Sequence, residues 1–127
     1  MSATRRLLLP HVAIVAAYLG WRVGLLPEPV MLTILVAAHL ALPVWCVIAA
    51  PASPLLRVFL IGPGTLIATY LGLIAWAMAG LRDGPGEDTW IAWMALLLAL
   101  AAVGGYLVYC LLVFGITAAR RRRKRRS

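Results

Sequence analysis

Four long apolar segments run along this chain, separated by short stretches rich in proline, glycine and charge. The apolar segments cover residues 7–26, 30–50, 55–80 and 89–119. A helix needs about 20 apolar residues to cross the hydrocarbon core of a bilayer. Helices are required because lipid cannot satisfy a bare backbone, and proline and glycine end them. The pattern therefore predicts an all-α, polytopic membrane protein with four transmembrane helices in a compact bundle.

Composition favours a membrane protein over a soluble globule. Of the 127 residues, 64% are hydrophobic and 13% are charged, and the mean hydropathy is +0.96. A soluble domain is about one quarter charged, and a globule of this size buries only roughly 60–70% of its surface. We therefore expect the bilayer to be the main solvent for one transmembrane domain over residues 1–119, followed by a polybasic tail over residues 120–127.

Charge predicts the orientation in the membrane. Every basic residue except Arg22 and Arg82 falls on the side of the predicted bundle that carries both termini, whereas all four acidic residues fall on the other side. Short loops rich in Lys and Arg stay in the cytoplasm. We therefore expect a multi-pass protein of a bacterial-type inner membrane with both termini cytoplasmic. The basic start is similar to that of a signal peptide, but the apolar stretch runs too far past Ala17, so we expect the first helix to be retained.

Seven consecutive cations close the sequence. Cations near a bilayer surface attract anionic lipid headgroups by up to ~1 kcal/mol each, and the same run suits an acidic partner protein. Nucleic acid binding is disfavoured, although any basic run attracts phosphate, because no aromatic residues interleave with the cations. The cations expected to meet anionic lipid or a partner are Arg120, Arg121, Arg122, Arg123, Lys124, Arg125 and Arg126.

Small residues recur at four-residue spacing on the predicted helices, and the first helix contains a G-x-x-x-G. Such stripes let helix backbones approach closely in lipid, where apolar burial gives no advantage. They serve packing inside the bundle, or packing against a partner membrane protein or a second copy, and we expect at least one stripe to face a partner. The predicted helix-packing residues are Ala16, Gly20, Gly24, Gly64, Ala68, Gly72, Gly104 and Gly105.

His39 is the best candidate for chemistry, near the middle of the second apolar segment with Pro43 four residues on. An ionisable group at the bilayer midplane is a functional hypothesis by default, and this one suits ligation of haem b, a hydrogen bond to a quinone or a proton relay. The alternative is a neutral histidine with no cofactor, bonded to a threonine hydroxyl (Thr33, Thr65 or Thr69) or to the carbonyl freed by Pro43. His11 differs from it by roughly 9 Å in depth, too much to share one iron, and is expected at the membrane interface.

The run Gly62-Pro63-Gly64 interrupts the third apolar segment, because proline removes a backbone hydrogen bond. Broken helices bind ions and substrates in some transporters, although such a break also simply bends a helix. No carboxylate lies within an expected span, and no Ser/His/Asp set, H-E-x-x-H or phosphate-binding glycine loop occurs. We therefore expect no catalytic residue and no metal site. Cys46 and Cys110 lie in apolar segments without a C-x-x-C motif.

These observations favour a non-catalytic accessory or anchor subunit of a larger membrane complex, which acts by helix packing. One alternative is a small homo-oligomeric transporter or channel that uses the Gly62-Pro63-Gly64 break and His39. A second alternative is a haem- or quinone-binding electron-transfer anchor centred on His39.

Overall fold

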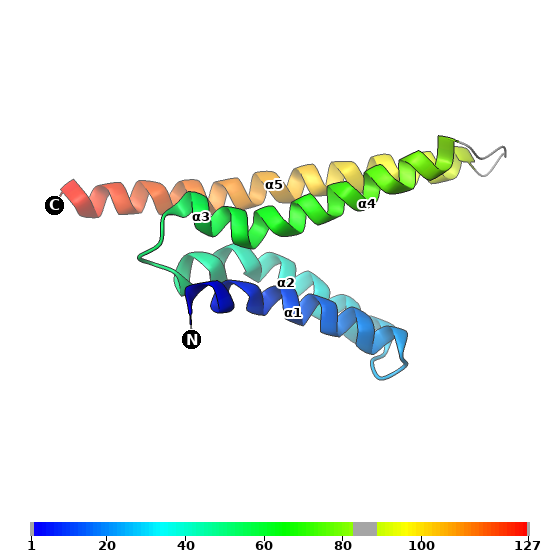
Figure 1. The fold of residues 1–127 in the computed structure, drawn as a ribbon, viewed down its shortest axis with the longest axis horizontal. Helices are drawn as coiled ribbons and strands as arrows, with labels where there is room; N and C mark the ends of the chain where they lie inside the picture. Colours follow the sequence, from blue (N-terminus) through cyan, green and yellow to red (C-terminus); the bar gives the residue numbers. More distant parts are fainter. Residues whose placement is uncertain (1, 83–88, 127) are drawn as a thin grey trace.

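The chain folds into helices joined by turns, as the computed structural model shows for all residues except 1, 83–88 and 127 (Figure 1). The all-α class predicted from the sequence is confirmed for the described residues. A π-helical turn, Leu60–Gly64, connects the helix Leu55–Phe59 to the helix Thr65–Arg82 without a break, so that the three form one continuous helical rod. The α-helices are α1 (Ala3–Arg22), α2 (Glu28–Ala49), α3 (Leu55–Phe59), α4 (Thr65–Arg82) and α5 (Thr89–Arg126).

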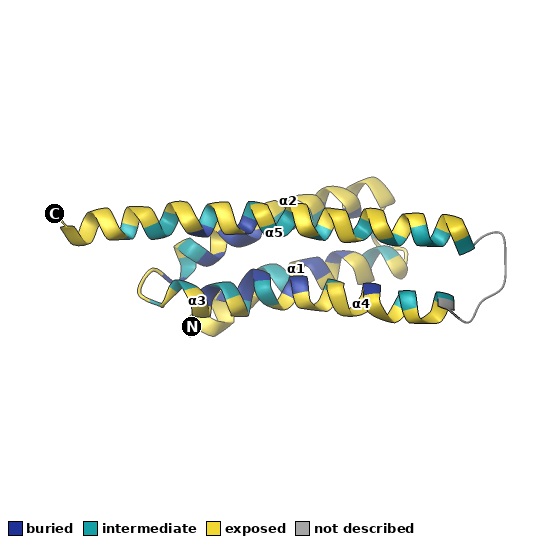
Figure 2. Cartoon of the chain, turned by 90° about the horizontal axis from the view of Figure 1, so that it is seen from above, coloured by how far each residue is buried: buried dark blue, intermediate teal, exposed yellow. Residues whose placement is uncertain are grey.

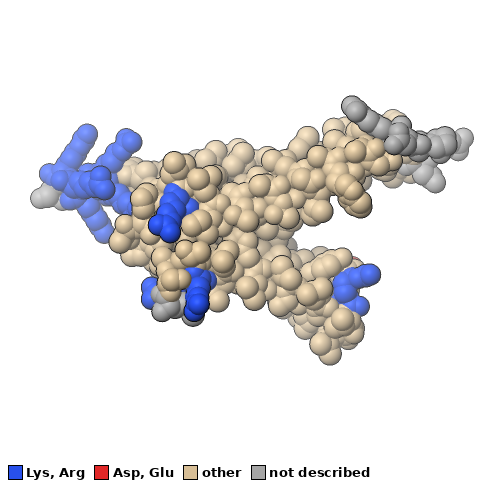
Figure 3. Space-filling model, in the orientation of Figure 1, with Lys and Arg blue, Asp and Glu red and all other residues tan. Residues whose placement is uncertain are grey.

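The helices form two hairpins that lie together at one end and diverge at the other. One hairpin is α1 with α2, and the other is the α3–α4 rod with α5 (Figure 1). Both chain ends lie where the hairpins meet, which we call the terminal end; the opposite end, with the α1–α2 turn, is the turn end. The space-filling view shows the hairpins separated toward the turn end (Figure 3). It also shows the Lys and Arg side chains gathered mainly at the terminal end.

Among the described residues, three helices are long and apolar enough to cross a membrane. They are α2 with 22 residues, the α3–α4 rod over Leu55–Leu81 with 27 residues, and α5 with 38 residues. The sequence predicted a fourth span over residues 7–26, but α1 begins at Ala3 and ends at Arg22, so it carries arginines at both ends. Within the described residues, α1 is not among the helices that are apolar enough to cross a membrane. The structure therefore supports a membrane protein, in which three helices could cross the membrane by their length and composition.

Gly24 ends the first helix instead of continuing it. Its φ is +81°, the left-handed conformation that favours glycine. The amide of Leu25 donates to the carbonyl of Gly20 at 2.8 Å and the amide of Gly24 donates to that of Trp21 at 3.1 Å, which is the Schellman pattern of helix termination. The G-x-x-x-G run was expected to lie on one packing face of a longer helix. The structure places Gly24 in the turn beyond α1, because its backbone takes the conformation that stops the helix.

Pro10 fixes the contact between the two helices of the first hairpin. A proline inside a helix has no amide N–H, so Pro10 leaves the carbonyl of Arg6 without its helical donor. The indole Nε1 of Trp45 on α2 donates to that carbonyl at 2.7 Å. Backbone groups of a membrane protein must find partners inside the protein. Trp45 therefore supplies, from a second helix, the hydrogen bond that Pro10 removes.

The buried core lies toward the terminal end (Figure 2). Gly62 allows the π-helical turn to approach α2 closely there, because a Cβ at this position would lie 2.5 Å from the Sγ of Cys46. Residues 89–105 of α5 contain no buried side chain, so half of that helix adds nothing to the core. The clustered core residues are Leu7, Ile14, Leu42, Cys46, Ala50, Val58, Leu66 and Phe114.

Candidate functional site

The polar side chains of the bundle interior gather around His39 on α2. The ring is half-buried, and its Nδ1 lies 2.6 Å from the carbonyl of Leu35, one helical turn back. A carbonyl only accepts, so Nδ1 carries the proton and Nε2 of a neutral ring is an acceptor. The hydroxyl of Tyr70 on α4 donates to that Nε2. The Tyr70 ring also stacks on the imidazole, with centroids 5.7 Å apart.

Pro43 and Tyr106 connect the backbone of His39 to the third helix of this cluster. Pro43 lacks the amide that would bond to the carbonyl of His39 in an unbroken helix. The hydroxyl of Tyr106 on α5 donates to this carbonyl at 2.8 Å. The hydroxyl of Tyr109 donates to the next carbonyl, that of Leu40, at 2.6 Å. The sequence reading proposed that a carbonyl freed by Pro43 would bond to His39, but the freed carbonyl belongs to His39 itself.

The geometry makes His39 a structural junction between α2, α4 and α5. Both ring nitrogens are engaged, and an axial haem ligand needs one nitrogen free. Ligation by His39 therefore requires loss of the bond to Tyr70 in this arrangement. The three threonines expected as partners of His39 donate instead to backbone carbonyls one turn back in their own helical rods. Thr33 donates to Pro29, Thr65 to Leu60 and Thr69 to Thr65. Within the described residues, no group of three His, Cys, Asp or Glu side chains is placed to hold a metal ion.

A second polar contact lies at the π-helical turn. The run Gly62-Pro63-Gly64 forms this turn, where the wider winding changes which amide meets which carbonyl. Nε2 of His11 on α1 donates to the carbonyl of Gly62 at 3.0 Å. The sequence reading placed His11 at the interface, whereas the structure directs it at this turn. Its other nitrogen, Nδ1, is buried and has no hydrogen-bond partner among the described residues.

The predicted helix-packing residues divide into three kinds of place. Gly20 packs under the side chain of Leu26, since a Cβ would lie 3.0 Å from its Cδ1. A Cβ at Gly64 would lie 2.9 Å from the carbonyl oxygen of Phe59 in the same rod. Open space surrounds Gly72, Gly104 and Gly105, where an added Cβ would meet nothing within 4 Å. Gly20 and Gly64 thus serve the chain's own fold. The open positions, together with the exposed Ala16 and Ala68, are accessible to another molecule.

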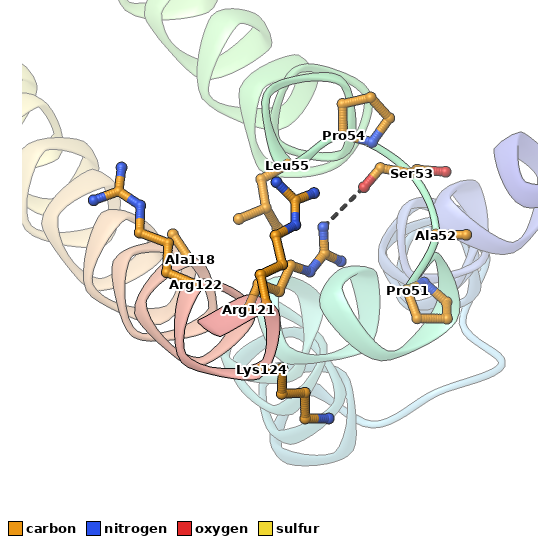
Figure 4. A pocket seen from close by; sticks show the side chains of 10 residues that line it. Pro51, Ala52, Ser53, Pro54, Leu55, Ala118, Arg121, Arg122 and Lys124 are labelled. Atoms are coloured by element: carbon orange, nitrogen blue, oxygen red, sulfur yellow. Dashed lines mark hydrogen bonds between the residues drawn. The ribbon is translucent and has the colours of Figure 1, made fainter. Parts of the chain in front are cut away.

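The basic tail continues α5 as a helix and lies against the turn between α2 and α3. Arg121 donates from Nη1 to the carbonyl of Ser53 at 2.9 Å and from Nη2 to that of Ala50 at 3.5 Å. Ala50 follows the last residue of α2, where unpaired carbonyls attract cations. Tail and turn enclose a pocket of about 670 Å³ (Figure 4). Its lining residues are Pro51, Ala52, Ser53, Pro54, Leu55, Ala118, Arg121, Arg122, Lys124 and Arg125.

Sequence reasoning missed Tyr70, Tyr106 and Trp45, which hold these contacts together. A usable signal was present, because each carries a hydrogen-bond donor inside an apolar segment, where lipid offers no acceptor. Pro10 and Pro43 each free one carbonyl inside a helix. The sequence could therefore have predicted that Tyr and Trp donors bond to the carbonyls freed by the prolines. It could not have predicted which donor bonds to which carbonyl.

Comparison with models of known protein families, with characterised proteins and with solved structures found no match to this chain. Three features of the molecule bear on its function: the His39 cluster, the open glycine positions of α4 and α5, and the basic pocket.

Proposed function

We propose that this protein is a non-catalytic accessory or anchor subunit of a larger complex in a bacterial-type inner membrane. The observation that carries the proposal is the free surface of α5. No residue of 89–105 is fully buried within the chain, and Leu98 is 68% exposed. Gly104 and Gly105 on the same helix face open space. The first half of α5, which contributes so little to the core, is available for packing against another protein.

The chemistry of packing in lipid explains why the glycines matter on such a surface. Apolar side chains gain nothing by leaving lipid for protein, so helix association depends on close backbone contact and van der Waals packing. Gly104 permits that contact because no side chain keeps a neighbouring helix away.

We further propose four spans, with both termini in the cytoplasm. The twenty residues of α1 give a length of about 30 Å, which matches the hydrocarbon core. Arg5 and Arg6 lie near one end of α1 and Arg22 ends it, so their long side chains can reach the headgroups on each side. The terminal end carries most of the cations, which favours the cytoplasmic side for it.

The test is purification of the full-length chain in mild detergent after crosslinking in cells. The variant Gly104→Leu places a bulky side chain on the proposed contact. Its matched control is Ala102→Leu, because two residues turn a helix by about 200° and Ala102 is also exposed. We expect a stoichiometric membrane partner with the wild type and the control, and at least roughly tenfold less with Gly104→Leu. Elution of the wild type as a lone monomer would contradict the proposal.

The π-helical turn favours a second candidate, a small homo-oligomeric transporter or channel. Helical irregularities of this kind are frequent at functional sites, and His11 directs one ring nitrogen at the carbonyl of Gly62. The sequence reading placed His39 in this pathway, but the bonds of His39 to Leu35 and Tyr70 give it a packing role. Ion flux into liposomes that contain the purified protein, lost in His11→Phe, would favour this candidate over the accessory subunit.

A further inference from the structure

We propose that the basic pocket at the terminal end binds the phosphate headgroup of one anionic phospholipid. This inference goes beyond the accessory role and rests only on insertion of the chain in a membrane. It differs from a general attraction of the tail to a charged surface, because it assigns the lipid to a defined place between the α2–α3 turn and the last turns of α5.

The helical conformation of the tail selects which cations line this place. Because α5 continues to Arg126, the positions 118, 121, 122 and 125 fall on one face of the helix, at helical spacings of three and four residues. That face is the one that lines the pocket. Arg120 and Arg126 are exposed on the same helix but do not line it. An unstructured tail would not sort its cations in this way.

Arg121 fixes the tail against the turn. Its two hydrogen bonds, to the carbonyls of Ser53 and Ala50, hold the guanidinium in place without any anion. Figure 4 shows Arg121 reaching across to Ser53, with Arg122 and Lys124 on its two sides. The pocket is therefore shaped before a ligand arrives, so that a bound anion does not have to order the tail itself.

The lining of the pocket suits a phosphate group. Among the described residues that line it, four are Arg or Lys and none is acidic. Arginine presents a planar set of N–H donors that matches phosphate oxygens, and lysine adds a point charge. The volume of about 670 Å³ lies within the usual range for small-ligand sites.

The position of the pocket favours a lipid over free phosphate. Its lining includes apolar side chains beside the cations, those of Leu55 and Ala118. Leu55 is where the α3–α4 rod begins, and Ala118 lies where the apolar part of α5 ends. A phospholipid has the same arrangement, with a charged headgroup attached to acyl chains. Free phosphate would use the cations but gain nothing from Leu55 and Ala118.

The experiment measures lipid retained by the full-length protein in detergent, by native mass spectrometry, with phosphatidylglycerol or phosphatidylcholine added. We expect one bound phosphatidylglycerol on the wild type. Removal of two lining cations, Arg122→Gln with Arg125→Gln, should lower its retention roughly 10- to 30-fold, from the value of a cation near a lipid surface. The matched control, Arg120→Gln with Arg126→Gln, removes the same charge from the tail outside the pocket and should change retention less than about twofold.

A second pair of variants changes residues of α3 instead of residues of the tail. Leu55→Asp places a carboxylate in the lining and should abolish retention of phosphatidylglycerol, whereas Leu56→Asp at the exposed neighbouring position should not. Equal losses in the two tail variants would overturn the proposal in favour of diffuse attraction. Equal retention of phosphatidylcholine would overturn it as well. Displacement of the lipid by an equal concentration of inorganic phosphate would assign the pocket to the free anion instead.

Discussion

The hydroxyl of Tyr106 on α5 donates a hydrogen bond of 2.8 Å to the backbone carbonyl of His39 on α2. That carbonyl needs a donor from outside its helix, because the residue four positions on is Pro43. The same relation occurs in the first hairpin, where Trp45 donates to the carbonyl that Pro10 leaves free. Each proline thus frees a carbonyl acceptor that a side chain of a neighbouring helix occupies.

Removal of the Tyr106 hydroxyl should therefore destabilise the bundle. In Tyr106→Phe the His39 carbonyl loses its donor in a place without water, and we expect a loss of about 1–3 kcal/mol in the free energy of unfolding. The control is Tyr109→Phe, whose hydroxyl meets the carbonyl of Leu40. Leu40 keeps an amide donor four residues on, so the control should lose less than about 1 kcal/mol. Unfolding in mixed micelles, followed by circular dichroism, measures both, and equal losses would contradict this explanation.

A double-mutant cycle tests the pair Pro10 and Trp45. In Trp45→Phe the carbonyl of Arg6 loses its indole donor, and we expect a loss of about 1–2 kcal/mol in stability. In Pro10→Ala, residue 10 regains an amide that can bond to that carbonyl. Trp45→Phe made in the Pro10→Ala background should therefore be nearly neutral, with a coupling of about 1 kcal/mol between the two changes. Additive effects in the unfolding measurement would show that the indole bond does not substitute for the missing amide.

The contact of Gly62 with Cys46 predicts a substitution that can be rescued. A methyl group at residue 62 would lie 2.5 Å from the Sγ of Cys46, and such overpacking costs about 1–3 kcal/mol. We expect Gly62→Ala to lower the unfolding midpoint and Cys46→Ala, made in addition, to restore part of it. Gly72→Ala is the control, because open space surrounds that glycine. A loss in Gly62→Ala that Cys46→Ala leaves unchanged would point to the backbone of the π-helical turn instead of the contact.

Sequence and structure agree where a feature depends on local pattern alone. The apolar runs predicted helices, and the proline at residue 63 predicted an irregularity that the structure places at Leu60–Gly64. The stop at Gly24 was misread, because spacing alone cannot distinguish a packing glycine from a helix-ending one. The pairing of Tyr106 with His39 joins residues 67 positions apart. Such a contact depends on how the hairpins meet, which no local pattern records.

The hydrogen bonds of His39 predict an absorption spectrum without haem. Leu35 and Tyr70 occupy both ring nitrogens, so we expect no Soret band in protein purified from cells supplied with a haem precursor. Tyr70→Phe removes the hydroxyl that bonds to Nε2 of His39. This variant tests whether release of that nitrogen is enough for His39 to bind haem. A Soret band in the wild type that His39→Ala abolishes would favour the electron-transfer anchor over the accessory subunit.

The number of spans can be decided by labelling single cysteines in intact cells with a membrane-impermeant maleimide. The native thiols Cys46 and Cys110 are fully buried, so they should add little background. Leu25 is 80% exposed at the turn end, and Thr4 is exposed at the start of α1. If α1 crosses the membrane and the terminal end is cytoplasmic, Leu25→Cys is labelled and Thr4→Cys is labelled only after lysis. Labelling of both in intact cells would mean that α1 lies on the outer surface, and that the chain crosses the membrane three times.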